Sequence, residues 1–390
     1  MLTIGVPRET IPGENRVAVI PETAGKLVQA GHQVVVESGA GQAASHTDQA
    51  YRDVKATVAA DARAALERAD IVVRVREPRP ATSGHEADLI REGATLIAFL
   101  DPLRNGELLE RLAARRVTAF AMEKIPRITR AQRMDALSSM STVAGYKAAL
   151  MAADHLGKFF PLLMTAAGTI APAKVFVLGA GVAGLQAIAT SRRLGAVVEA
   201  FDVRPAVKEE VQSLGATFVH LDLTNEQLVG AGGYAKAMSA EQEARERELI
   251  HQHIKGSDVV ISTAIVPGRK APVLITEAMV RDMRPGSVIV DLAAEMGGNC
   301  ELTQPGGATR AHGVEILGPV NLAAALPVHA SQMYARNVLA LLQHLVKDGA
   351  LALDFDDEIT RDTCVTHAGA VRVAGAPAKP VGATPTQVPA

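Results

Sequence analysis

The sequence predicts an α/β protein with two doubly wound parallel-sheet domains that are linked by long helices. At 390 residues the chain is long enough for two domains of ordinary size, each with its own core. Short β-rich runs alternate with segments of helical period before residue 122 and again after residue 174, which is typical of parallel sheets. Two long helical patterns, at 140–156 and 331–345, flank the second region and can carry the chain from one domain to the other and back.

Five strands are expected in each region. Those of the first are Thr3–Val6, Val34–Glu37, Ile71–Val75, Thr95–Leu100 and Val117–Ala121, and those of the second are Val175–Leu178, Val197–Phe201, Thr217–His220, Val259–Thr263 and Val288–Leu292. In the second region the corners 194–196 and 214–216 both read Leu-Gly-Ala, as expected where glycine ends consecutive crossover helices. We therefore expect one domain at 1–136 with 327–373, a second at 137–326, and a flexible tail at 374–390 that is rich in proline and small residues.

A glycine-spaced turn follows the first strand of the second region. Gly179, Gly181 and Gly184 form a G-x-G-x-x-G pattern that opens directly into a helix predicted over 182–194. In such a pattern the first glycine allows a tight turn, the second lets the backbone approach a pyrophosphate, and the third lets the helix lie close to the sheet. The next strand ends at Asp202, whose carboxylate can accept a hydrogen bond from a ribose 2′-hydroxyl and repels a 2′-phosphate. The pattern therefore predicts a Rossmann-like site that prefers NAD to NADP, although Arg204 nearby weakens that preference.

A second glycine pattern, at 39–44, is the weaker interpretation of a nucleotide site. It follows a strand and fits G-x-G-x-x-A, but Ser45–Asp48 interrupts any immediate helix. No second strand in this part of the chain ends in an acidic residue about twenty residues later, where a ribose would need it.

The composition excludes several classes of protein. Forty basic and 42 acidic residues give a net charge of −2, and a 3% aromatic content offers few platforms for base stacking, so no nucleic-acid binding is expected. The only cysteines, Cys300 and Cys364, exclude a disulfide framework and a cysteine-based metal site and fit a reducing compartment. No histidines have metal-ligand spacing, so no metal is expected. The N-terminus lacks a signal-peptide pattern and no apolar run is long enough for a membrane span, so we expect a cytoplasmic chain.

Several segments carry a resemblance to a known family that covers nearly the whole chain. They are the densely polar run Pro126–Tyr146, Met164–Gly168 with Pro172–Lys174, the glycine pattern, Gly232–Lys236, Pro267–Gly268 with Ala271–Pro272, and Val290–Ala293 with Gly297–Cys300. In these segments the chain closely resembles the alpha subunits, or NAD(H)-binding domain I, of proton-translocating NAD(P) transhydrogenases. The related alanine dehydrogenases share the start Pro7-Arg8-Glu9 and Arg16, so they are the rival interpretation.

The resemblance implies roles for named residues. Four residues of the polar loop would fix the nicotinamide carboxamide and ribose for hydride transfer: Arg127, Gln132, Asp135 and Ser138. The residues implied to bind NAD(H) are Gly179, Gly181, Val182, Ala183, Gly184, Asp202, Val203, Arg204, Gly233, Tyr234 and Ala264. Gly230–Met238 would close over the nucleotide as a glycine-hinged lid, and the alternative is an ordinary flexible loop. For the polar segment, taken without the resemblance, the alternative is an ordinary surface loop.

The resemblance also implies partners. The chain would form a homodimer, hold NAD(H) in the cleft between its two domains, and exchange hydride with NADP(H) on a beta subunit. Membrane-spanning partner subunits would supply the proton path and keep the chain peripheral on the inner face of the plasma membrane. Asn321–Ala325 departs from the family, which often has an arginine after Pro-Gly or Pro-Ser there, so no cofactor or subunit contact is inferred at that point.

Reaction chemistry separates this interpretation from the rival. Oxidation of an amino acid needs a group that accepts the N–H proton, whereas hydride transfer between two nicotinamides needs none. At the ends of the third and fourth strands, alanine dehydrogenases have a lysine and a histidine, and this chain has Arg74 and Asp101. Arginine stays protonated and is a poor proton shuttle. A self-sufficient amino-acid dehydrogenase is thus the second hypothesis, and a non-enzymatic NAD sensor, which the intact polar loop disfavours, is the third.

Overall fold

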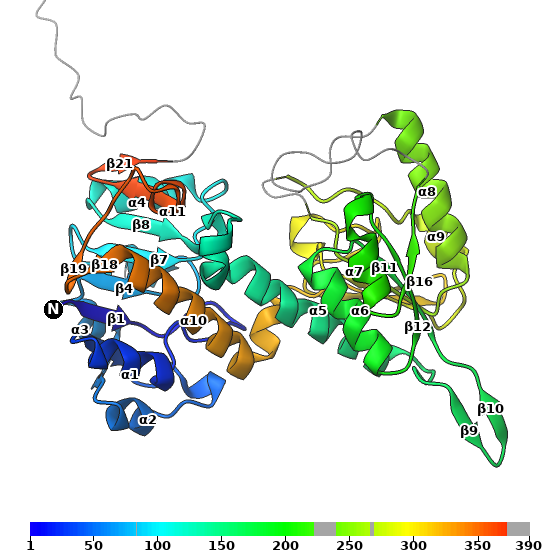
Figure 1. Ribbon diagram of the computed structural model, residues 1–390, viewed down its shortest axis with the longest axis horizontal. Coiled ribbons are helices and arrows are strands. Elements are labelled where there is room, and N and C mark those ends of the chain that lie inside the picture. The colour runs from blue at the N-terminus through cyan, green and yellow to red at the C-terminus, as the bar shows by residue number, and fades with distance from the viewer. Residues whose placement is uncertain (83, 222–238, 266–268, 373–390) are drawn as a thin grey trace, which may run out of the picture. The chain divides into compact units, whose positions relative to one another are not determined.

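The computed structural model describes residues 1–82, 84–221, 239–265 and 269–372 (Figure 1). They form two compact units, one made of Met1–Met140 with the segment that begins at Ala324, and the other of Ser141–Ala323. Each unit contains one large, mainly parallel sheet, and the α/β fold class predicted from the sequence is confirmed. The expected lid, with Gly233 and Tyr234, and the expected tail lie outside the described residues.

The first unit is built on an eight-stranded sheet in the order β21-β20-β8-β7-β4-β1-β2-β3. Its strands are β1 (Thr3–Val6), β2 (Gln33–Glu37), β3 (Thr57–Ala59), β4 (Ile71–Val73), β7 (Thr95–Ala98), β8 (Thr118–Ala121), β20 (Cys364–His367) and β21 (Ala370–Val371). Strands β1, β2, β3, β4, β7 and β8 pair in parallel, and β20 and β21 add antiparallel strands at one edge. The helices are α1 (Pro21–Gln29), α2 (Asp48–Asp53), α3 (Ala62–Leu66), α4 (Gly106–Ala114), α10 (Pro327–Leu345) and α11 (Glu358–Thr363). Two-residue strands form the hairpins β5 (Pro80–Ala81) with β6 (Gly84–His85) and β18 (Val346–Lys347) with β19 (Ala350–Leu351).

The second unit is built on a seven-stranded sheet in the order β13-β12-β11-β14-β15-β17-β16. Its strands are β11 (Lys174–Leu178), β12 (Val197–Phe201), β13 (Thr217–Val219), β14 (Val259–Ser262), β15 (Val288–Asp291), β16 (Ala308–Ala311) and β17 (Val314–Leu317), of which only β16 is antiparallel. The helices are α5 (Ala136–His155), α6 (Val182–Arg193), α7 (Lys208–Ser213), α8 (Ala240–Lys255) and α9 (Glu277–Arg281), and α5 begins in the first unit. The hairpin of β9 (Leu163–Thr165) and β10 (Gly168–Ile170) extends away from the sheet (Figure 1).

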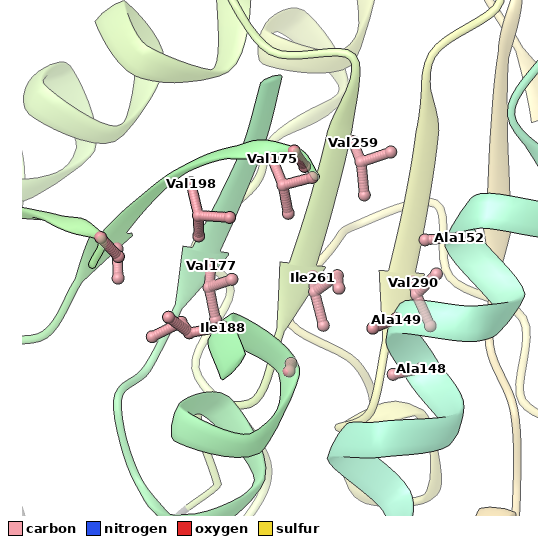
Figure 2. Close-up of a cluster of buried hydrophobic side chains, with 14 of the residues drawn as sticks. Ala148, Ala149, Ala152, Val175, Val177, Ile188, Val198, Val259, Ile261 and Val290 are labelled. Atoms are coloured by element: carbon pink, nitrogen blue, oxygen red, sulfur yellow. The ribbon is translucent and has the colours of Figure 1, made fainter. Parts of the chain in front are cut away.

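Both faces of the second sheet are buried, which explains why its strands read as continuous apolar runs. In β11, Val175 and Val177 point to one face and belong to a core cluster in which Ile188 of α6 lies beside Val177 and alanines of α5 lie beside Val290 of β15 (Figure 2). The alternate residues Phe176 and Leu178 point to the other face and join the core formed with α8 and α9. The two layers of helices hold the carboxyl ends of β11, β12 and β14 in fixed relative positions, and the candidate site lies at those ends.

The predicted strands all exist, but several end earlier than expected, and short strands were missed. β4 ends at Val73 and β7 at Ala98, because the chain beyond them leaves the sheet to form loops. β3 was missed because it is a three-residue edge strand that is not buried. β16, β17, β20 and β21 were missed as well, and of these β16 and β21 are also edge strands with few buried residues.

Candidate functional site

The turn between β11 and α6 has a backbone that requires glycine. Gly179 has a φ of +94°, and an added Cβ there would lie 2.6 Å from Thr263 Oγ1. A Cβ on Gly184 would lie 1.8 Å from the carbonyl oxygen of Gly179, so only glycine lets α6 come this close to the turn. A Cβ on Gly181 would meet no heavy atom of the described chain within 4 Å, so the turn is open on that side.

The first residues of α6 are suited to binding an anion at this opening. Val182 and Ala183 form the first turn of the helix, where backbone N–H groups have no acceptor within the helix and the helix dipole is positive. The N-cap residue of α6 is Gly181, which has no side chain that could hydrogen-bond to these N–H groups. The donors and the open space therefore fit the pyrophosphate of a dinucleotide.

Asp202 follows β12 and lies against the glycine turn. Its Oδ2 accepts hydrogen bonds from the backbone N–H of Ala180 at 2.7 Å and from Arg204 Nη2 at 2.8 Å. Its Oδ1 accepts hydrogen bonds from the backbone N–H and the Nε of Arg204 at 2.8 and 2.9 Å. A carboxylate offers about four lone-pair positions. Since these four bonds fill them, a ribose hydroxyl can bind Asp202 only when a donor of the Arg204 side chain withdraws.

The loop after β14 is fixed against the glycine turn by residues that the sequence did not single out as site residues. A Cβ on Gly179 would lie 3.5 Å from the nitrogen of Ala264. Asn299, which is fully buried, accepts a hydrogen bond from that nitrogen and donates one to the carbonyl oxygen of Ala264. Asp291, at the end of β15, in turn accepts hydrogen bonds from the backbone of Asn299 and from Ser262 Oγ. In the sequence, Asp291 and Asn299 stand out only as members of two segments that carry the family resemblance, and their contacts arise in the folded unit.

The polar loop lies in the first unit, and the structure brings two of its four implicated residues together. Asp135 caps α5, because its Oδ1 accepts the backbone N–H of Ser138 at 2.8 Å and its Oδ2 accepts the hydroxyl of Ser138 at 2.6 Å. Arg127 and Gln132 are exposed, and Gln132 lies in a short 3₁₀ helix at Thr129–Met134. That helix contacts α10, where Asn337 donates a hydrogen bond to the carbonyl oxygen of Arg133. Asp135 and Ser138 thus fix the start of α5, and Arg127 and Gln132 are presented at the surface of the unit.

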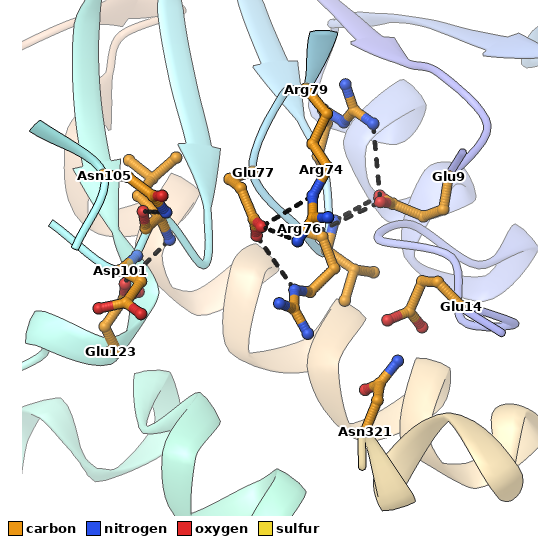
Figure 3. Close-up of polar contacts among 12 residues, drawn as sticks. Glu9, Glu14, Arg74, Arg76, Glu77, Arg79, Asp101, Asn105, Glu123 and Asn321 are labelled. Atoms are coloured by element: carbon orange, nitrogen blue, oxygen red, sulfur yellow. Dashed lines mark hydrogen bonds and ion pairs between the residues drawn. The ribbon is translucent and has the colours of Figure 1, made fainter. Parts of the chain in front are cut away.

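Arg74 belongs to a cluster of charged side chains in the first unit (Figure 3). Its Nη1 donates a hydrogen bond to Glu86 Oε2 at 2.8 Å, and its Nη2 lies 3.7 Å from Glu9 Oε2. The side chains of Arg74 and Glu9 are both 3% exposed, and burial raises the pKa of Glu9 despite the neighbouring guanidinium. Two carboxylates of the chain itself thus hold the guanidinium of Arg74.

Asp101 lies at the end of the neighbouring strand β7, on a more exposed loop, with a φ of +44°. Its backbone N–H and that of Leu100 donate hydrogen bonds to Glu123 Oε1. Burial raises the pKa of Asp101 and that of Glu123, and repulsion from the Asp101 carboxylate adds to the rise in the pKa of Glu123. No histidine takes part in these contacts.

The structure also describes the second glycine pattern and the segment that departs from the family. The second glycine pattern enters a 3₁₀ turn, Gln42–Ala44, and Ser45 then adopts a left-handed conformation, so no helix opens there. Asn321, at the departure from the family pattern, donates its backbone N–H to Glu295 Oε1. Within the described ranges, no group of three or more potential metal ligands gathers, and no helix is long and apolar enough to cross a membrane.

Comparisons with known proteins agree on one family. The model of the alanine dehydrogenase/PNT N-terminal domain matches residues 5–144, and that of the C-terminal domain matches residues 148–374. An NAD(P) transhydrogenase subunit alpha chain of Rhodospirillum rubrum is 48% identical over 374 residues, which cover 95% of this chain and 97% of that protein. The structure of a transhydrogenase from Sinorhizobium meliloti is 45% identical, with a TM-score of 0.85 over 95% of this chain and 99% of that one. An L-alanine dehydrogenase structure is 30% identical, with a TM-score of 0.81 over 96% and 97% of the two chains.

Proposed function

This chain belongs to the alanine dehydrogenase/PNT family, and within that family we propose that it is the NAD(H)-binding alpha subunit of a proton-translocating NAD(P) transhydrogenase. The single observation that carries the binding part is the turn between β11 and α6, which combines an open side at Gly181, free helix N–H groups and a carboxylate at the end of the next strand. The names of relatives that are 41–48% identical to the chain support the transhydrogenase part.

The nucleotide site that we propose lies at the carboxyl ends of β11, β12 and β14. The backbone at Gly179, Gly181, Val182, Ala183 and Gly184 binds the pyrophosphate, and Ala264 borders the same turn. Asp202, with Val203 and Arg204, receives the adenosine ribose, and the Arg204 side chain turns away from Asp202 when the ribose hydroxyls bind. Gly233 and Tyr234 belong to the proposed lid.

The polar loop positions the nicotinamide. The nicotinamide ring of bound NADH supplies the hydride, and no proton has to move at this subunit. Arg127 and Gln132 hold the ring by its carboxamide, while Asp135 and Ser138 set the direction of the loop by capping α5. Holding two reactants in a near-attack geometry can supply about 7 to 11 kcal/mol of the barrier, so positioning suffices as the main catalytic contribution.

The remaining parts of the proposal concern other chains. A beta subunit holds NADP(H), accepts the hydride and, with membrane-spanning subunits, couples the transfer to proton movement. The chain acts as a homodimer and lies on the inner face of the plasma membrane through these partners. The domains proposed for it are 1–136 with 327–373, and 137–326.

The related amino-acid dehydrogenases are disfavoured by the charged cluster of the first unit. The guanidinium of Arg74 stays protonated and cannot act as the proton acceptor that amino-acid oxidation needs, and Glu86 and Glu9 already balance its charge. Asp101 stands where alanine dehydrogenases have a histidine, and Arg74 stands where they have a lysine. This chain therefore differs from them at both positions.

One experiment separates the two functions. The purified chain is incubated with NAD and a panel of small amino acids, and with NADH, pyruvate and ammonia, while its affinity for NADH is measured by calorimetry. We expect NADH binding and no turnover on any member of the panel. Turnover of an amino acid would establish the dehydrogenase, and absence of NADH binding would contradict both functions.

A further inference from the structure

Glu246 is a buried acidic residue whose position at the candidate site follows from the geometry of α8. Glu246, Ile250 and Ile254 are spaced by four residues, so they lie along one face of the helix, and they are 7%, 0% and 0% exposed. Ile250 and Ile254 belong to the core that includes Phe176, Leu178 and other residues on that face of the sheet. Glu246 is therefore on the face of α8 that points towards the sheet.

The direction of α8 places Glu246 at the same edge of the sheet as Asp202. β14 begins at Val259, shortly after α8 ends at Lys255, so the C-terminus of the helix lies at the amino ends of the strands and its earlier turns lie towards their carboxyl ends. A hydrogen bond of 2.7 Å between His253 Nδ1 and Glu199 Oε2 ties α8 to β12, the strand that leads into Asp202. Burial is the main cause of the raised pKa of Glu246, and repulsion from the Asp202 carboxylate adds to it.

The carboxylate of Glu246 makes no hydrogen bond or ion pair with any other described residue, although only 7% of the residue is exposed. Its charged neighbours are Glu243 and Arg247 on α8, and Asp202 with its partner Arg204 at the end of β12. Buried carboxylates that only stabilise a fold are normally paired. Glu246 has no such partner among the residues that the structure describes, and its position beside the candidate site points to a role in choosing the ligand.

The charge balance at this edge shows what that role is. Asp202 and Arg204 neutralise each other in the structure, and a ribose hydroxyl that displaces Arg204 from Asp202 also frees a guanidinium that could hold a 2′-phosphate. Asp202 and Arg204 alone therefore discriminate weakly between the two nucleotides. A further negative charge makes the net charge of the subsite unfavourable for a phosphate.

We propose that Glu246 is a second carboxylate of the adenosine-ribose subsite and that it acts with Asp202 to exclude nucleotides that carry a 2′-phosphate. The proposal rests on the proposed NAD(H) site and adds a specificity residue to it. It gives the subunit a means to keep NADP(H) off the site for NAD(H), which transfer between two different nucleotides requires.

The test compares the affinities for NADH and NADPH in three proteins: the wild type, Glu246→Gln, and Glu248→Gln. Glu248 is on the exposed face of the same helix, so its substitution removes the same charge without altering the subsite. Burial raises the pKa of Glu246 to about 7, so a 2′-phosphate can enter at pH 8 only with proton uptake that costs about tenfold in affinity, and at pH 6 it enters almost freely. The ratio of NADPH to NADH affinity is therefore measured at both pH values by calorimetry.

We expect Glu246→Gln to raise that ratio about tenfold over the wild type at pH 8 and to leave it nearly equal to the wild type at pH 6. The titration of the 2′-phosphate itself is common to all three proteins and cancels. Glu248→Gln should match the wild type at both pH values. Equal ratios in Glu246→Gln and wild type at pH 8, or the same change in Glu248→Gln, would overturn the proposal.

Two further results keep the outcomes distinct. If the wild type binds no NADH, the proposed function fails rather than the role of Glu246. If Glu246→Gln does not fold, as judged by circular dichroism, Glu246→Ala takes its place, because it removes the carboxylate and introduces a residue of high helix propensity. It must give the same rise in the ratio of NADPH to NADH affinity at pH 8.

Discussion

At the scale of single residues, Asp202 connects the local backbone with the choice of ligand. It braces the glycine turn through the N–H of Ala180 and is itself held by Arg204. We predict that Asp202→Ala weakens NADH binding by about ten- to a hundredfold, because the loss of a hydrogen bond to a charged group costs roughly 1.5 to 3 kcal/mol. Fluorescence titration measures the affinity, and Glu209→Gln, an exposed charge removal on α7, serves as the control. An unchanged affinity in Asp202→Ala would show that the ribose binds elsewhere.

Gln132 tests the nicotinamide side of the account. Gln132→Asn keeps the amide but shortens the side chain by one methylene, and a displacement of about 1 Å between reacting atoms can cost about a hundredfold in rate. We therefore expect a large loss of hydride-transfer rate with a much smaller change in NADH affinity. Single-turnover transfer and equilibrium binding are measured on the same preparation. If both fall by the same factor, Gln132 contributes to binding and not to positioning.

Glu246 also predicts how stability depends on pH. Burial, with the carboxylates of Glu243 and Asp202, raises its pKa from 4.5 to about 7 in the folded chain, so the folded state keeps a proton that the unfolded state loses between these values. The corresponding stabilisation is complete below pH 4.5 and is lost as the pH rises through 7. Glu246→Gln avoids that loss, so at pH 8.5 it should exceed the wild type by up to about 3 kcal/mol, and at pH 4 by almost nothing. Urea unfolding at the two pH values measures the difference, and a difference that is the same at both would contradict the assigned titration.

At the scale of elements, α5 and α6 make a very close contact in the second unit. A Cβ added to Gly145 of α5 would lie 2.1 Å from the carbonyl oxygen of Ala183, in the first turn of α6. The backbones of the two helices touch at this point, so the position of α5 sets that of the proposed pyrophosphate turn.

We predict that Gly145→Ala destabilises the protein and weakens NADH binding. Helix propensity alone would predict a more stable protein, because alanine is favoured over glycine within a helix by roughly 1 kcal/mol. Gly106→Ala at the start of α4, where an added Cβ meets nothing within 4 Å, is the matched control and should be neutral or stabilising. Thermal unfolding and NADH titration are the measurements. A stabilised Gly145→Ala with normal affinity would mean that α6 tolerates displacement.

Much of the element order follows from local patterns in the sequence. The glycine turn, the strand before it and the helix after it were predicted because each glycine has a local steric reason. The start of α5 at Ala136 was placed later, at 140, because the capping role of Asp135 depends on where Ser138 lies in the folded loop. The hairpin β9–β10 and the edge strands β3, β16 and β21 were missed because such short, little-buried strands carry almost no periodicity.

At the scale of the whole molecule, the two units share a pattern that the sequence did not reveal. In each, the first five strands of the sheet follow the order 3-2-1-4-5, as in dinucleotide-binding folds, and the sixth parallel strand beside them is β8 in the first unit and β17 in the second. Strand order depends on long-range pairing, so periodicity along the chain cannot show it. The glycine turn of the second unit follows the first strand of its sheet and fits a nucleotide, whereas the glycine pattern of the first unit follows the second strand, β2, and enters a 3₁₀ turn.

The candidate site was less predictable than the fold for a similar reason. Asp202 and the glycines were found because a motif fixes their spacing. The contacts of Asn299 with Ala264 and the inward position of Glu246 arise from separate segments that meet only in the folded unit.

The transfer of hydride itself tests the central claim most directly. NADH deuterated at nicotinamide C4 is mixed with this chain and with a purified NADP(H)-binding transhydrogenase subunit loaded with NADP⁺, and the products are analysed by mass spectrometry. We predict that deuterium appears in NADPH without exchange with solvent, only when both proteins are present, and at a rate that Gln132→Asn lowers. No deuterium in NADPH with a partner subunit that is active with a known alpha subunit would contradict the account.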